Sequence, residues 1–233
     1  MKLSDLFSLD ALFDICLWLP VILISISFHE YAHGWAAYRL GDPTAKFAGR
    51  LTLNPLKHFN LFGFLMMLFV HFGWATPVPV NADNFKNPKR DMLMVALAGP
   101  GANLLLALVS SFIYSLFAYC LSLLSRMPGG FALIIIRIVV SLLLYLIYMN
   151  IGLAVFNLIP IEPLDGSYIL GFFMPQKYHV FMAKYGQYIQ IAFVLIVLLT
   201  SAVGNIIGVV QSTVADFFIE MWLIPIQWIG GLF

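Results

Sequence analysis

Leu17 to Tyr38 read LWLPVILISISFHEYAHGWAAY, an apolar run that contains the pattern His-Glu-x-x-His. A helix needs about 20 apolar residues to cross the hydrocarbon core of a bilayer, and this run has that length. Positions i and i+4 lie on one face of a helix, so His29 and His33 can bind one metal ion, with Glu30 beside it as a general base. The run therefore predicts a hydrolytic metal site inside a membrane-spanning helix.

Two alternatives to this interpretation are chance and a purely structural role. With 5 His among 233 residues, and Glu at positions 30, 162 and 220, the pattern arises by chance in about one such chain in a thousand. In a structural role, the three side chains would be hydrogen-bonded polar residues of a helix bundle. Polar and ionisable residues are costly in hydrocarbon and usually functional there, which favours the metal site.

The composition is that of an integral membrane protein. Hydrophobic residues make up 62% of the chain and charged residues 10%, whereas soluble domains have about 45–50% and about 25%. A chain of 233 residues leaves no room for an added soluble domain of normal size. We expect one membrane-embedded domain over residues 1–233, with a core at about 17–175 and a C-terminal span and interfacial tail at about 186–233.

The expected fold is an all-α polytopic membrane protein with about four transmembrane helices. Runs of spanning length lie at about residues 17–38, 92–124, 131–156 and 189–210. Leu61–Trp74 is apolar but too short to span, which predicts a re-entrant segment. The tail Val214–Phe233 mixes Trp, Asp and Glu with aliphatic residues, so it either lies along the interface or forms a poor fifth span.

Basic residues predict which ends of these helices are cytoplasmic. They gather on both sides of the Leu61 segment and after the third run, at Arg39, Lys46, Arg50, Lys57, Lys86, Lys89, Arg90, Lys177 and Lys184. By the positive-inside rule, these regions are cytoplasmic. His33 precedes Arg39 by six residues, which is about 9 Å of helix. The motif is therefore expected inside the hydrocarbon, nearer the cytoplasmic face, and water must enter from that side.

A catalytic zinc usually has three protein ligands, so a third must be found. The candidates are His58, His71, His179, Glu162 and Asp165. Asp165 follows the third run where it returns to the cytoplasmic side, at the depth of the first motif. Two prolines in NLIPIEPLDG, residues 157–166, prevent a regular helix and can turn a carboxylate inward. The alternative is that Asp165 caps a short helix at Ser167–Phe173; beside the first motif, we favour the ligand.

The two motifs together resemble the site-2 protease family of intramembrane zinc metalloproteases. They are His29-Glu30-x-x-His33 and Asn157-x-x-Pro160-x-x-x-Leu164-Asp165-Gly166. The likeness continues through RLGDPTA at 39–45, PVPVN at 77–81 and AGPxxN at 98–103, and covers most of residues 20–175. It is similar to the compact branch without PDZ or CBS domains. Glu162 departs from that branch, and is either a rival ligand, a base near the metal or a solvated loop residue.

The resemblance implies hydrolysis of peptide bonds in transmembrane proteins. It implies one Zn²⁺ per chain held by His29, His33 and Asp165, with Glu30 moving the proton of the attacking water. Asn157 is expected either to donate to the oxyanion or to cap its helix. Asn103 is expected to support helix packing.

Thr76–Asn81 predicts a small β-strand or loop element on the cytoplasmic side. Its alternating prolines suit an edge strand, so Val78 and Val80 are predicted to help bind an extended substrate by strand addition. The alternative is a rigid loop that supports the Leu61 segment. His58 and His71 are either groups of a gate or channel, or surface histidines.

The expected partners are transmembrane protein substrates and the lipid bilayer, with no nucleic acid. The expected location is a prokaryotic inner membrane, with the active site towards the cytoplasm. Competing functions are a zinc-binding scaffold without protease activity, a metal transporter, and a hydrolase of lipids or other small molecules. Transporters tend to contain repeated halves with broken helices, and this sequence has no second His-rich half, which counts against transport.

Overall fold

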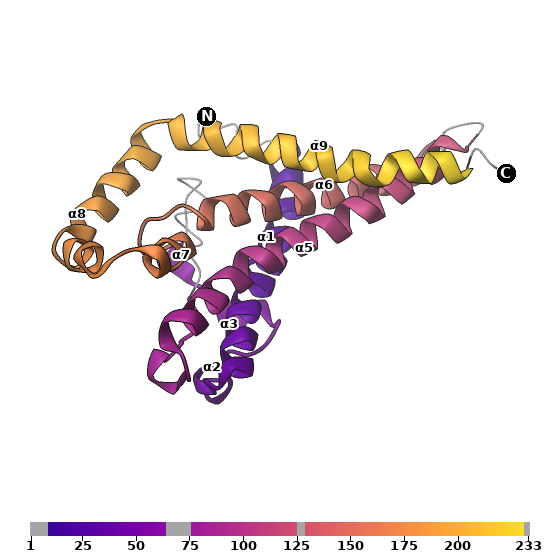
Figure 1. Cartoon of the computed structure of the whole chain (residues 1–233). Helices are drawn as coiled ribbons and strands as arrows, with labels where there is room; N and C mark the ends of the chain where they lie inside the picture. Colours follow the sequence, from indigo (N-terminus) through magenta and orange to yellow (C-terminus); the bar gives the residue numbers. More distant parts are fainter. Residues whose placement is uncertain (1–8, 64–75, 125–128, 231–233) are drawn as a thin grey trace.

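The computed structural model describes residues 9–63, 76–124 and 129–230, and this part of the chain is helical (Figure 1). Its elements are α1 Leu9–Leu40, α2 Thr44–Phe47, α3 Pro55–His58, the 3-10 helix η2 Ala82–Asn84, α5 Pro88–Ser122, α6 Phe131–Asn157, α7 Asp165–Phe173, α8 Gln176–Leu199 and α9 Ala202–Gly230. Five of them, α1, α5, α6, α8 and α9, are long and apolar enough to cross a membrane. The prediction of an all-α polytopic membrane protein is thus confirmed, whereas the count of about four spans is not.

Helix α5 is the centre of the packing. It contacts α1, α6, α7 and α9, and α6 also contacts α1 and α9. Small residues make the close approaches, as where Ala107 of α5 meets Ile147 and Ile151 of α6 and Ala215 of α9. Lipid tails are as apolar as leucine, so helices in a membrane associate through close packing and polar contacts rather than by burying large apolar side chains. Large side chains accordingly face outward, for example Leu105 and Ile113.

The predicted span at 189–210 is wrong, because the chain breaks inside it. Helix α8 ends at Leu199, Thr200 is extended, and α9 begins at Ala202. The Thr200 backbone N–H and hydroxyl both donate to the Ile196 carbonyl, at 3.0 and 2.7 Å. Hydroxyl residues can satisfy backbone groups at such a break, so it needs no Pro or Gly, and an apolar run conceals it.

The C-terminal tail belongs to a long helix that packs along α5 and α6 (Figure 1). Its contacts alternate apolar and polar groups. Trp222 meets Phe112 with ring centroids 5.0 Å apart, and Gln211 donates to the Tyr148 carbonyl. The tail was predicted to lie along the interface or to form a poor fifth span because Trp, Asp and Glu interrupt it, yet Trp222, one of these residues, packs against α5.

Thr76–Asn81 forms no strand within the described residues. A strand needs a partner ladder, and Pro77 and Pro79 have no N–H to offer one. The N–H groups of Thr76, Val78 and Asn81 bond instead to the His58 carbonyl, the Glu30 carboxylate and the Asp42 carboxylate. The segment is thus a loop held by scattered contacts. Most of the predicted re-entrant segment, with His71, lies outside the described residues.

Candidate metal centre

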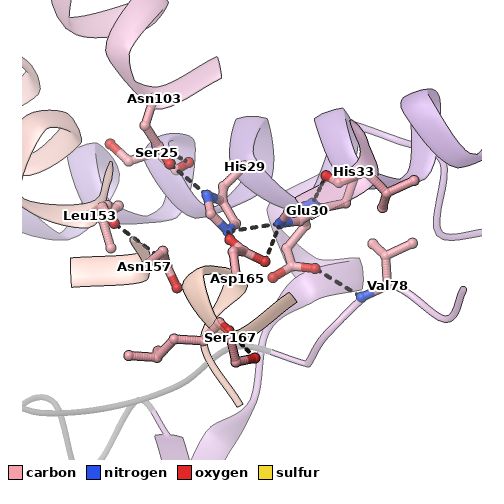
Figure 2. Close-up of polar contacts among 12 residues, drawn as sticks. Ser25, His29, Glu30, His33, Val78, Asn103, Leu153, Asn157, Asp165 and Ser167 are labelled. Atoms are coloured by element: carbon pink, nitrogen blue, oxygen red, sulfur yellow. Dashed lines mark hydrogen bonds and ion pairs between the residues drawn. The ribbon is translucent and has the colours of Figure 1, made fainter. Parts of the chain in front are cut away.

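The two motif histidines of α1 lie against one face of α5. His29 Nδ1 is 2.6 Å from Asn103 Oδ1 (Figure 2). His33 Nδ1 is 2.7 Å from the Val95 carbonyl oxygen. Val95, Gly99 and Asn103 are spaced four residues apart, so they form one stripe on α5. The two helices run in opposite directions, since the later histidine contacts the earlier residue. Each ring is thus held at Nδ1 and turns Nε2 towards the centre.

Gly99 provides the space that the two rings occupy. A Cβ atom at this position would lie 2.7 Å from His29 Cε1 and closer still to His33 Nε2. No side chain fits at that distance. The sequence predicts only a packing role for Asn103, and the spacing of residues 95, 99 and 103 is the signal that could have linked this stripe to the histidines.

Asp165 reaches the same point from α7. Its Oδ2 is 3.3 Å from His29 Nε2, and its Oδ1 is 3.3 Å from His33 Nε2, while the two Nε2 atoms are 3.0 Å apart. The Asp165 carboxylate does not cap α7, because Leu164 occupies the N-cap position and has no side-chain cap bond. A Cβ at Gly166 would be 2.5 Å from the Ile159 carbonyl oxygen, so a glycine is required where α7 starts against the end of α6.

The residues present fit a zinc ion. One ligand atom from each of His29, His33 and Asp165 lies within 4.8 Å of the others. Both Nδ1 atoms face oxygen acceptors, so in neutral rings both Nε2 atoms carry lone pairs. Asp165 Oδ2 is buried and has no hydrogen-bond partner among the described residues. Three groups of lone pairs converge with no proton donor between them, which is unfavourable unless a cation is bound, and two imidazoles with one carboxylate form a catalytic zinc set.

Glu30 lies beside this group, and the loop at Thr76–Asn81 holds it. Its Oε2 accepts the Val78 N–H at 2.8 Å (Figure 2). The Val78 side chain is buried, and Val80 packs into a cluster that includes Ala36. The two valine side chains therefore face the protein, while Pro77 is exposed.

The family model of peptidase family M50 matches residues 18–201. The chain belongs to this family. It is 38% identical over 176 residues to the "Putative zinc metalloprotease YwhC" of Bacillus subtilis, a match that covers 75% of this chain and 77% of the relative. It is 30% identical over 148 residues to the "Putative zinc metalloprotease Rip2" of Mycolicibacterium smegmatis, covering 62% and 52%. No solved structure matches the chain significantly.

This membership confirms the resemblance to the site-2 proteases. Together with the five long apolar helices, it makes the chain an integral, multi-pass membrane metalloprotease, and zinc its metal. The zinc ligands that the sequence predicted are the three residues that the structure brings together.

Asn157 ends α6 beside the centre of this M50 protein. Its Nδ2 donates to the Leu153 carbonyl of its own helix at 2.9 Å (Figure 2). An amide nitrogen carries two protons, so one remains for another acceptor. The oxyanion role of Asn157 stays a prediction.

The other candidates lie apart from the three converging residues. Glu162 and His179 line a cavity of about 470 Å³ between the start of α5, α7 and α8. Glu162 Oε2 points towards α8, where it would be 3.6 Å from a Cβ at Gly186. His58 is buried, with Nε2 2.8 Å from the Thr52 carbonyl oxygen. None of these three belongs to the group that could hold the metal within the described chain.

Asp42 anchors the loop that carries Val78. It is fully buried after the end of α1, and accepts the Asn81 N–H at 2.8 Å and the Asn84 side-chain amide at 2.7 Å. The Thr44 hydroxyl and N–H also donate to it. Burial raises the pKa of this carboxyl, but these hydrogen bonds outweigh burial and hold the pKa below its usual value. The sequence showed Asp42 only as part of the family likeness.

Proposed function

We propose that this M50 protein is an intramembrane endopeptidase that hydrolyses peptide bonds of transmembrane proteins within or near the bilayer. One observation carries the proposal: His29, Glu30 and His33, which meet Asp165 of α7, lie on a helix that is long and apolar enough to span a membrane, Phe13–Leu40. A water-dependent site in such a helix suits a substrate that is itself embedded in the membrane. Cleavage of regulatory membrane proteins is the process in which such an enzyme would act.

His29, His33 and Asp165 would hold the zinc. When bound, zinc supplies a Lewis acid that polarises the scissile carbonyl and lowers the pKa of water. Glu30 accepts the proton of the attacking water and delivers it to the leaving amine. The Val78 N–H occupies Glu30 Oε2 and fixes the orientation of the carboxylate, which leaves Oε1 for the proton.

Asn157 and the Thr76–Asn81 loop are the groups proposed to meet the substrate. The second N–H of the Asn157 amide would donate to the oxyanion that forms on the scissile carbonyl. The loop that contains Val78 and Val80 lies directly beside Glu30. It would pair with an extended stretch of substrate through its backbone carbonyls and the Val80 N–H, since the N–H groups of Thr76, Val78 and Asn81 are already bonded. A helix hides its peptide bonds, so part of the substrate must be extended to react.

The proposed location is a prokaryotic inner membrane, with the site open to the cytoplasm. The basic residues that flank α2, α3 and the start of α5 support this orientation. The named relatives are bacterial, which supports the choice of membrane.

The test compares Glu30→Gln with wild type in purified protein, measuring zinc content and cleavage of a transmembrane substrate. Glutamine keeps the shape of the side chain but cannot take the proton, so we expect zinc to be retained and cleavage to fall by about 10²–10⁴-fold. Glu220→Gln, an exposed position on α9, is the matched control and should cleave normally. Cleavage by Glu30→Gln at the wild-type rate would contradict the role of Glu30. Zinc binding without cleavage in wild type would favour a non-proteolytic scaffold.

A further inference from the structure

A chain of buried polar groups extends from His29 away from the metal centre. Its members are Asn103 on α5, Asn150 on α6 and Ser25 on α1, and each is fully buried. Asn103 Nδ2 donates to Asn150 Oδ1 at 2.7 Å and to the Ser25 carbonyl at 3.2 Å. Asn150 Nδ2 donates to Ser25 Oγ at 2.9 Å and to the Leu146 carbonyl at 2.8 Å. Three helices therefore meet in this cluster.

The bonds fix the direction of every amide in the cluster. The Ser25 hydroxyl donates to the Val21 carbonyl at 2.8 Å, so towards Asn150 its oxygen is an acceptor. Asn150 must then direct its nitrogen to Ser25 and Leu146, and its oxygen to Asn103. Asn103 faces two acceptors on that side, so its nitrogen lies there and its oxygen lies at His29.

We propose that Asn103 is a positioning residue that sets the tautomer of His29, and that Asn150 orients Asn103 for this task. An oxygen 2.6 Å from Nδ1 requires that nitrogen to carry the proton. The lone pair of neutral His29 is then on Nε2, which faces Asp165. An inverted Asn103 amide would place two N–H donors against Nδ1 and favour the tautomer with the proton on Nε2, which cannot bind the metal there.

The two histidines differ in how their tautomer is secured. His33 Nδ1 faces the backbone carbonyl of Val95, whose direction the helix sets. His29 depends on a side-chain amide, which has two orientations of nearly equal shape. Asn150 removes that ambiguity. This account explains why a second buried amide lies behind Asn103, which helix packing alone does not require.

The first test measures the zinc affinity of the full-length protein by competition with a chelator, without substrate. Loss of a hydrogen-bond partner behind a metal ligand typically weakens metal binding 10–100-fold, so we expect that loss in Asn103→Ala. Asn103→Asp keeps an oxygen for His29 but disturbs Asn150, so it should lower the unfolding temperature while zinc affinity stays within about fivefold of wild type. If Asn103 only supported packing, each substitution would lower the zinc affinity and the unfolding temperature together.

Ser115→Ala is the matched control on the same helix. Ser115 is fully buried and donates to the Ile219 carbonyl of α9 at 3.1 Å, far along α5 from the histidines. It should lower stability and leave zinc affinity unchanged. Asn150→Ala should weaken zinc binding less than Asn103→Ala, because Ser25 still accepts from Asn103. If Asn103→Ala binds zinc as tightly as Ser115→Ala, the proposal is overturned.

The second test does not depend on whether a variant at position 103 folds. Nitrogen NMR of the zinc-free wild-type protein, labelled in histidine and assigned with His29→Gln, should show His29 protonated at Nδ1 and bare at Nε2 at a pH where the ring is neutral. A proton on Nε2 would overturn the proposal. Both tests measure properties of the metal site, namely zinc affinity and the protonated nitrogen of His29, and neither measures cleavage. Their outcome is therefore independent of the test of the proposed peptidase activity.

Discussion

The junction of α1 with α5 and the junction of α6 with α9 use the same building principle with different outcomes. At both junctions, a glycine lets a polar side chain approach. Gly99 faces His29 and His33, and a Cβ at Gly152 would lie 3.0 Å from Gln211 Nε2. At α6–α9 the donor meets an acceptor, the Tyr148 carbonyl, and the contact is complete. At α1–α5 the Nδ1–H groups of His29 and His33 point away from the centre. The lone pairs of their Nε2 atoms and of the Asp165 carboxylate therefore face one another.

The difference shows how a membrane protein turns a helix contact into a metal site. Polar bonds between helices in lipid are worth little each, about 0.6 kcal/mol on average. The metal site therefore does not result from stronger hydrogen bonds between the helices than those at the α6–α9 junction. It comes from directing every Nδ1 donor to α5, so that His29 and His33 present acceptors to Asp165.

Gly99→Ala, at the junction of α1 with α5, should have the largest effect on zinc binding. The added methyl group would occupy the space of both imidazoles, and we expect zinc affinity to fall about 100-fold or more, since overpacking of about 3 kcal/mol corresponds to that factor. Chelator competition measures it. Gly101→Ala, two residues along α5, is the control and should bind zinc normally, because none of the described residues lies within 4 Å of a Cβ built there. Equal affinities in the two variants would show that the rings do not need this space.

Asp42→Asn should have an intermediate effect, on stability rather than on zinc. The carboxylate accepts hydrogen bonds from Thr44, Asn81 and Asn84, and losing its charge should cost about 1–3 kcal/mol at neutral pH. Because the folded-state pKa is below the unfolded one, this stabilisation is full above the unfolded pKa, about 4, and is lost as the pH falls through the folded pKa.

Unfolding temperatures measured from pH 7 down to pH 3 check this prediction. The wild type should lose its advantage over Asp42→Asn as the medium becomes acidic. Asp83→Asn is a suitable control, since Asp83 lies on η2 in the same region and is exposed. A gap between wild type and Asp42→Asn that does not change with pH would contradict the role of the charge.

Gln211→Leu should have the smallest effect. It removes one interhelical bond between α9 and α6, so the free energy of unfolding should fall by about 0.6 kcal/mol, and by no more than about 1.7 kcal/mol. Zinc affinity should not change, because the polar contact at this junction is complete without a metal. Thermal unfolding and zinc titration of the same sample measure both. Weaker zinc binding in this variant would show that the two junctions are coupled.

The site was more predictable from the sequence than the path of the later helices. His29 and His33 lie four apart on one helix, and Asp165 follows a span that returns to the same depth, so periodicity and topology were enough to predict that these three residues converge. The break at Thr200 was missed because two hydroxyl residues within an apolar run hardly change its hydropathy. The Val78–Glu30 contact joins residues 48 positions apart, and no local pattern encodes it.

By itself, the sequence determined a membrane protein with His29 and His33 on one helix face and Glu30 beside them, because composition and helical spacing are local properties. The peptidase function came from the resemblance of its motifs to a known family. Tertiary structure alone decided that Gly99 makes room for the rings and that Val95 and Asn103 hold them. It also decided that the Val78 N–H donates to Glu30, and that Asp42 accepts hydrogen bonds from Asn81 and Asn84. These depend on how α1 and α5 cross and on the direction of single amides. Helix crossing and amide orientation arise from packing between distant segments, which no single stretch of sequence specifies.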